Sequence, residues 1–180
     1  MEVTVHNGFP VAPRSRDSVC RAARLDSISL APQGGAVDLP KILDILSGHD
    51  RVHYDVLDAK DWKAAGNVEA YYAYNEKTIF FKASMFDALC RGNTRARFTV
   101  AHELGHALLE HVPNFNRLSA NRIPKNCHSE LQANAYAAAF LMNASEIRAK
   151  KLYTPAAVAS YFKVSIQTAS FRLRELGLSE

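Results

Sequence analysis

The sequence predicts an α+β fold, because segments typical of strands gather in one region of the chain and helical segments follow them. Three segments rich in β-branched and aromatic residues lie between residues 52 and 83. From about residue 94 onward, apolar residues recur with helical spacing in two long segments and then in two shorter ones. We therefore expect a small antiparallel sheet packed against a two-helix core, followed by C-terminal helices of the helix-turn-helix type.

The length of the chain, 180 residues, supports one domain and leaves room for a small appendage. Residues 1–37 are expected to form a partly irregular N-terminal arm, because prolines and glycines interrupt them, with one short helix around residues 16–24. A central domain is expected over residues 38–150. A C-terminal helical segment over residues 151–180 is expected to pack on it.

The central domain is expected to begin with a helix over about residues 38–47. Asp38 can cap this helix, and Pro40 suits its first turn. Strands should follow, and a short polar connection between the last two favours a hairpin. The three strand segments are 52–57, 68–74 and 78–83.

Two long helices should form most of the remaining central domain. The first is expected over about residues 94–111, with Asn93 or Thr94 as its cap and Pro113 beyond its end. A polar loop of roughly 16 residues follows. The second long helix is rich in alanine and is expected over about residues 130–142. Two shorter helices are expected over about 155–162 and 166–176.

Composition and cysteine content exclude several classes of protein. Hydrophobic residues make up 48% of the chain and charged residues 22%, which is ordinary for a soluble globular protein. No apolar run approaches the roughly 18 residues that span a bilayer, and the N-terminus lacks the pattern of a secretory signal. Three cysteines are too few, and odd in number, for a disulfide framework, so we expect a reducing cytoplasm and no membrane contact. The net charge of +4 permits contact with nucleic acid but does not argue for it.

The most specific signal in the chain is an H-E-x-x-H motif at His102, Glu103 and His106. Two histidines four residues apart lie about 40° apart around a helix and about 6 Å apart along it, so both imidazoles can hold one metal ion. Glu103 lies between them and can act on a metal-bound water as general base. A chain of this composition would contain the motif by chance only about 0.01 times, so we interpret it as a zinc site.

A catalytic zinc usually has three protein ligands, and the sequence offers several candidates for the third. The metzincin pattern fails, since Leu109 and Val112 occupy the positions where glycine and histidine should stand. His111 is expected to face away from the first pair, about 140° round a helix that continues to this residue. Glu110 lies on the right face of that helix but a full turn beyond the site.

We favour Glu130 as the third ligand. Its helix would present a carboxylate to the motif helix, and the alanines further along would let the two helices pack closely. Asn134, one turn further on, could accept the outward N–H of a ligand histidine. Cys127 and His128 have suitable chemistry but lie at the edge of a loop. Glu130 could instead be a first-turn glutamate that the helix dipole favours.

The two helical motifs resemble those of the ImmA/IrrE metallopeptidases. The resemblance rests on the run Phe98–His106 and on Glu130–Met142, and it covers about residues 50–178. Asn143 stands where the family often has proline, a departure that affects how the helix ends and not the metal chemistry.

The resemblance implies a compact α+β zinc peptidase domain of the gluzincin type. His102, His106 and Glu130 match the metal ligands of the family, and Glu103 matches its catalytic glutamate. Such proteins are typically encoded with a helix-turn-helix repressor, and several are thought to cleave that repressor.

The C-terminal residues 158–177 resemble a helix-turn-helix, with the turn at residues 163–165. The positions that could face a DNA groove are Gln167, Thr168, Ser170, Arg172 and Arg174. Only two of these are cations and Glu175 adjoins them, so we expect no tight DNA binding. We expect the segment to pack on the peptidase domain and to help hold or recognise a protein partner. The apolar residues expected to dock it are Phe162, Ile166, Phe171, Leu173 and Leu176.

The favoured hypothesis is an intracellular zinc-dependent endopeptidase that cleaves a helix-turn-helix repressor or antitoxin-like regulator encoded nearby and so derepresses transcription. Zinc and Glu103 together would generate the attacking hydroxide, and Glu103 would pass the proton to the leaving amine. The candidates for an oxyanion donor are His128, His111 and several tyrosines. The alternative is a metal-stabilised regulator that binds a transcription factor or DNA without cleavage. The sequence predicts no particular oligomeric state.

Overall fold

The predicted α+β fold is confirmed by a computed structural model, which describes residues 8–62, 64, 68–113 and 123–178. The first seven residues of the expected arm and residues 114–122 of the expected polar loop lie outside the described residues. The helices are α1 (Arg16–Leu30), α2 (Leu39–Gly48), α3 (Ala83–Cys90), α4 (Thr94–Leu108), α5 (Ser129–Leu141), α6 (Ala144–Ala149), α7 (Pro155–Phe162) and α8 (Ile166–Glu175). The strands are β1 (His53–Leu57), β2 (Ala70–Ala73) and β3 (Thr78–Lys82).

The sheet is mixed, which corrects the antiparallel sheet expected from the sequence. The hairpin of β2 and β3 is present, with Tyr72 opposite Ile79, but β1 runs parallel to β3. The strand order is β1-β3-β2, because residues 58–69 form a connection long enough to leave room for β3 between the first two strands. The central strand β3 therefore gains two partners, and its Ile79 and Phe81 side chains are fully buried.

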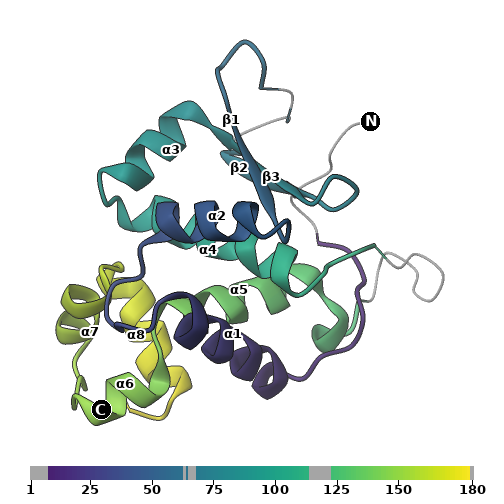
Figure 1. The fold of residues 1–180 in the computed structure, drawn as a ribbon. Helices are drawn as coiled ribbons and strands as arrows, with labels where there is room; N and C mark the ends of the chain where they lie inside the picture. The colour runs from purple at the N-terminus through teal and green to yellow at the C-terminus, as the bar shows by residue number, and fades with distance from the viewer. Residues whose placement is uncertain (1–7, 63, 65–67, 114–122, 179–180) are drawn as a thin grey trace.

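The two long helices α4 and α5 pack against each other, and α1 packs along α5 (Figure 1). Gly105 of α4 lies close to the backbone of Ala133 in α5, so the alanines predicted to allow a close approach do lie in the interface. Helix α1 is longer than the short helix expected around residues 16–24. Beyond residue 24, Ser27 is buried, Leu30 packs against the core and Asp26 accepts a hydrogen bond from the Tyr136 hydroxyl. These contacts stabilise the helix as far as Leu30.

Helices α3 and α6 were not predicted from the sequence. Helix α3 begins directly at the end of β3 and has no side-chain cap, so the residues carry no start signal. Helix α6 is short, and Asn143 caps it by accepting a hydrogen bond from the backbone N–H of Ser145. Asn143 therefore separates α5 from a new helix at the position noted as a departure from the family pattern.

The C-terminal helices α7 and α8 match their predicted ranges closely and meet at Lys163, which has a left-handed backbone (φ 55°). Phe162 and Leu173 are buried as expected, but the expectation was wrong for Ile166 and Phe171, which are 64% and 57% exposed. Those two side chains point away from the core because the buried face of α8 is formed by Ala169, Arg172 and Leu173.

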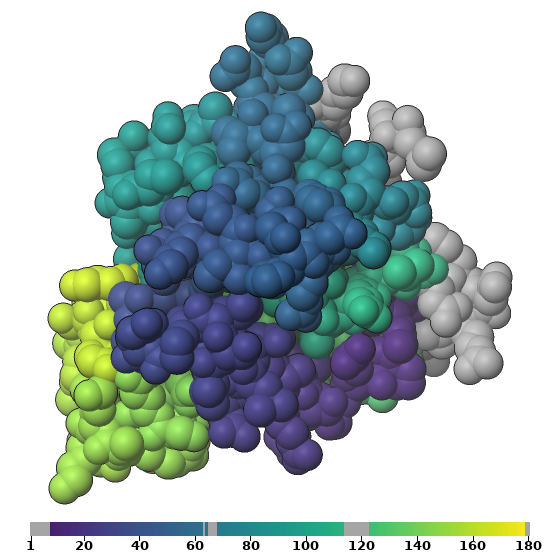
Figure 2. Space-filling model, in the orientation of Figure 1, coloured from purple at the N-terminus to yellow at the C-terminus, as the bar shows by residue number. Residues whose placement is uncertain are grey.

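Helices α6 to α8 form one corner of the molecule, against residues of α1 and of the segment after it (Figure 2). Two buried arginines hold them there: Arg97 of α4 donates to the backbone oxygen of Lys163, and Arg172 donates to that of Met142. Within the described ranges, no helix combines the length and the apolar character that a membrane crossing requires.

Candidate metal centre

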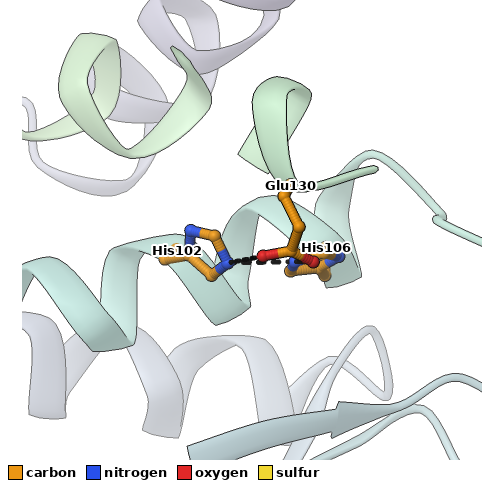
Figure 3. A group of neighbouring side chains, drawn as sticks. All are labelled: His102, His106 and Glu130. Atoms are coloured by element: carbon orange, nitrogen blue, oxygen red, sulfur yellow. Dashed lines mark hydrogen bonds and ion pairs between the residues drawn. The ribbon is translucent and has the colours of Figure 1, made fainter. Parts of the chain in front are cut away.

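Helices α4 and α5 bring His102, His106 and Glu130 together (Figure 3). The two histidines leave α4 one turn apart, and Glu130 leaves the first turn of α5. Their Nε2 atoms are 3.1 Å apart, and the carboxylate oxygens of Glu130 lie 3.1 Å from Nε2 of His102 and 3.3 Å from Nε2 of His106. Candidate ligand atoms of all three residues lie within 4.8 Å of one another.

The chemistry of this donor set fits a zinc ion. Two imidazole nitrogens and one carboxylate oxygen are a common ligand set for catalytic zinc, which keeps a further position open for water or substrate. Asn93 caps α4, the helix that carries both histidines, by accepting hydrogen bonds from the backbone N–H groups of Arg95 and Ala96. Among the described residues these three side chains are the group that could hold a metal ion.

The electrostatics of the three side chains favour a cation at their centre. Burial opposes the charged form of Glu130, but its hydrogen bonds with His102 and His106 hold the pKa of the carboxyl well below its usual range. Burial likewise lowers the pKa of His102, yet the hydrogen bond with Glu130 and the nearby carboxylates outweigh it, so the net shift is upward. A charged carboxylate thus faces two imidazoles at short distance, the arrangement that a divalent cation requires.

Glu103 lies beside the cluster without belonging to it. Glu103 is 7% exposed, and strand β2 packs against α4, the helix that carries it. Burial raises the pKa of the Glu103 carboxyl, and the two nearby histidines oppose this shift only in part. A carboxylate with a raised pKa is a better proton acceptor, which suits the general base expected at this position.

Asn134 contacts His102 on the side away from the cluster. Its Oδ1 atom lies 3.1 Å from Nδ1 of His102. This is the contact anticipated from the helical spacing of Asn134 and Glu130. With Nδ1 as the donor, the lone pair of Nε2 is left facing Glu130 and His106.

His111 contradicts the expectation that it faces away from the histidine pair. Helix α4 ends at Leu108, and Glu110 has a left-handed backbone (φ 54°), so the chain turns back instead of continuing as a helix. The N–H of His111 donates to the backbone oxygen of His106, and the two Nδ1 atoms are 3.0 Å apart. His111 therefore lies behind His106 and does not reach the cluster.

The other nitrogen of His111 contacts Gln132 of α5, at 3.0 Å from Oε1. Both ring nitrogens are engaged and the residue is 2% exposed, which removes His111 from the candidates for an oxyanion donor. Burial lowers the pKa of His111 to about 4, and the adjacent His106 adds to the effect. Sequence reasoning gave Gln132 no role, because no helical spacing relates it to the motif histidines.

The remaining candidates for a third ligand are not part of the cluster. Glu110 occupies the left-handed turn, and Cys127 and His128 precede α5. Residues 8–14 run past this region: Phe9 donates its N–H to Ser129, and its ring centroid is 6.3 Å from that of His106. At Gly8 (φ +64°) an added Cβ would collide with the ring of His128, so only glycine suits this close approach.

The segment that carries the centre is similar to a known family. A family model described as Peptidase_M78, IrrE N-terminal-like domain, matches residues 90–174, which confirms the resemblance read from the two motifs. A solved structure of a Mycobacterium tuberculosis transcriptional regulator shares the fold over 86% of this chain, with a TM-score of 0.55 and 15% sequence identity. This chain spans 55% of the length of that regulator chain. No curated protein sequence is similar enough to this chain to count as a match.

Proposed function

We propose that the chain is a zinc-dependent endopeptidase, because its residues 90–174 match the model of the Peptidase_M78 family, IrrE N-terminal-like domain. In the proposal His102, His106 and Glu130 bind the metal, and Glu103 is the general base. The observation that carries it is the convergence of these three ligand atoms within 4.8 Å, with the buried carboxylate of Glu103 next to them.

The proposed roles divide the chemistry between the metal and the chain. When bound, zinc would acidify a water molecule and polarise the carbonyl of the scissile peptide. Glu103 would accept a proton from the attacking water and return it to the nitrogen of the leaving amine. The nearby backbone of Tyr72 favours the charged form of the Glu103 carboxyl, which is the form that accepts a proton. Asn134 holds the ring of His102 in place through its Nδ1 atom.

The position of β2 suggests how a peptide would approach. This strand is at an edge of the described sheet, with β3 as its neighbour, and it packs against α4, the helix that carries Glu103. An extended segment of substrate that added to this edge would lie beside the candidate metal ligands, and edge pairing is a common mode of peptide recognition. A segment that is already extended and exposed in its own protein is therefore the expected target.

The substrate proposed is a helix-turn-helix regulator encoded near this chain. The family resemblance implies such a target, and the solved structure with the same fold carries the description of a transcriptional regulator. Action on such a protein requires a compartment where both are present. The free thiols of the three cysteines suit the reducing cytoplasm.

Direct DNA binding has less support from the C-terminal helices. Arg172, one of the two cations expected to face DNA, is 3% exposed and bonded to Met142 and Glu175. Arg174, the other, stacks on the ring of Phe171 at 4.5 Å. With Arg172 engaged, this pair of cations would neutralise too few phosphates for tight binding. We therefore assign these helices to contact with a protein partner.

The decisive variant is Glu103→Gln, tested with a purified candidate repressor as substrate. An amide cannot accept a proton, so the cleavage rate should fall about 10²- to 10⁴-fold while zinc content and unfolding temperature stay close to wild type. Glu110→Gln is the matched control, because it makes the same change on the same segment outside the cluster. Equal cleavage by Glu103→Gln and wild type would overturn the assignment of the base.

A further inference from the structure

We propose that Gln132 and His111 are positioning residues that fix the tautomer of His106, so that its Nε2 lone pair faces the metal. The proposal rests on the proposed function in that His106 is taken as a metal ligand. It concerns three side chains in a row, Gln132, His111 and His106, which we call the histidine relay. The relay lies behind the candidate metal centre, on the side away from Glu130.

The relay begins with an amide that has only one allowed orientation. Nε2 of Gln132 lies 3.0 Å from the backbone oxygen of Ala12 and 2.8 Å from that of Asn126. Both partners are carbonyl oxygens, which can only accept, so the NH₂ group must point at them. In a flipped amide the Gln132 side-chain oxygen would face these two carbonyl oxygens, and none of the three could donate a hydrogen bond. Since Gln132 is 3% exposed, water cannot relieve such a contact.

The orientation of Gln132 then determines which nitrogen of His111 carries the proton. Oε1 of Gln132 can only accept, and it lies 3.0 Å from Nε2 of His111, so that nitrogen is the donor. The Nδ1 atom of a neutral His111 is left with a lone pair. It lies 3.0 Å from Nδ1 of His106, and two nitrogens at this distance share one proton. His106 must therefore supply it.

The result is a defined state of His106. Its Nδ1 carries a proton and donates to His111, so Nε2, which faces His102 and Glu130, is the nitrogen left to bind the metal. A histidine without such a partner would distribute its proton between both nitrogens, and one of those forms cannot bind metal through Nε2. The relay removes the unproductive form before any metal arrives.

The relay also gives a role to segments that lack motif residues. Ala12 belongs to the N-terminal segment and Asn126 to the turn before α5, and each contributes only a backbone carbonyl. Their effect reaches His106 through two side chains. His102 has an independent partner, Asn134, so the two histidines can be perturbed separately.

The first test is the tautomer itself, read from the ¹⁵N chemical shifts of the imidazoles in the metal-free, full-length chain. The expected result in wild type is a proton on Nδ1 of His106 and on Nε2 of His111. An Nδ1 of His106 without a proton would overturn the proposal, and no variant needs to fold for this measurement to decide.

The second test uses variants at position 111 and Zn²⁺ alone as the probe. His111→Phe keeps the ring but removes the acceptor, so His106 should lose its fixed tautomer and the dissociation constant for Zn²⁺ should rise about 10- to 100-fold. His111→Asn places an amide oxygen near the former Nδ1 and should restore most of the affinity. A merely space-filling role for His111 predicts the opposite order, with the phenylalanine variant better than the asparagine variant, and that order would refute the relay.

The matched control is Asn134→Leu, which removes the partner of the other histidine. It should change the ¹⁵N shifts of His102 and leave those of His106 as in wild type. Equal effects of Asn134→Leu and His111→Phe on His106 would contradict a specific relay. Failure of the proposed peptidase activity is a separate outcome, since it would leave these shifts and the Zn²⁺ affinities unchanged.

Discussion

Replacing Gly105 by alanine tests the close approach of α4 and α5 on which the candidate metal centre depends. A Cβ atom at this position would lie 3.1 Å from the backbone oxygen of Ala133, 3.2 Å from its Cα and 3.2 Å from Cβ of Tyr136. These distances are shorter than ordinary van der Waals contact, and the atoms involved are backbone or fully buried. Helix α5 must therefore shift by a few tenths of an ångström to accept the methyl group.

Two opposing contributions set the magnitude. Alanine in place of glycine in a helix stabilises by about 0.4–1 kcal/mol, because the unfolded chain loses freedom. Forcing a methyl group into a closely packed interface costs about 1–3 kcal/mol. The cost is the larger contribution, so Gly105→Ala should destabilise the protein by about 1 kcal/mol and lower its unfolding temperature by about 2–4 °C.

The metal affinity should fall as well, for a geometric reason. Glu130 moves with α5, whereas His102 and His106 stay on α4. Metal–ligand distances tolerate a deviation of only about 0.2 Å, which is comparable with the expected shift. The dissociation constant for Zn²⁺ should therefore rise even where the fold is retained.

The assay compares chemical unfolding and Zn²⁺ titration of Gly105→Ala with those of Gly48→Ala. Gly48 ends α2 and has no atom within 4 Å of an added Cβ, so alanine there should stabilise the protein. If Gly105→Ala stabilised the chain as much as Gly48→Ala and bound Zn²⁺ as wild type does, the argument from close packing would be refuted.

Three further changes test other parts of the structure. Glu130→Ala should abolish stoichiometric zinc in metal analysis, whereas Glu76→Ala, in the exposed turn after β2, should not. Phe162→Ala should cost about 3–5 kcal/mol in urea unfolding because the ring is fully buried, while Phe171→Ala should change stability by less than about 0.5 kcal/mol. Burial alone would raise the pKa of Glu175, but its hydrogen bond with Arg16 and the charge of Arg172 hold that pKa below its ordinary value of 4.5. Ionised Glu175 therefore stabilises the folded state above pH 4.5, and this stabilisation is lost as the pH falls through the lower pKa that Glu175 has in the folded protein. Glu175→Gln should destabilise the protein by about 1–2 kcal/mol at pH 7 and by less in acid.

Local spacing was enough to predict the part of the centre that lies on one helix. His102 and His106 are four residues apart, and the geometry of a helix brings their rings to one side regardless of what packs around it. The same holds for Glu130 and Asn134, which share a face of α5. That these residues bind metal and assist it stays a prediction until metal content is measured.

His111 shows where local reasoning failed. Its expected direction assumed that α4 continues to residue 111, but the helix ends three residues earlier and Glu110 adopts a left-handed conformation. Glutamate carries no strong signal for such a turn, since glycine is the usual residue there. The turn is stabilised by the contacts that the His111 ring makes with His106 and Gln132.

The direction of β1 and the burial of Arg172 could not be predicted for a related reason. The residues of β1 have the same strand propensity in either direction, so only the tertiary pairing with β3 fixes the direction of β1. Arg172 was expected to face a DNA groove as part of the helix-turn-helix pattern. It is buried instead, where its Nε donates to the backbone oxygen of Met142 and its guanidinium pairs with Glu175.

The sequence by itself determined the fold class, the positions of the long helices and the pair of histidines, because each of these depends on periodicity or propensity over a few neighbouring residues. The tertiary structure alone decided the mixed sheet, the turn that places His111 and the orientation of Gln132. Gln132 meets Ala12 across 120 positions of the chain, and no periodic pattern relates residues so far apart. Such contacts form only when α5 packs between the N-terminal segment and α4, so the physical reason is packing, which a linear pattern does not encode.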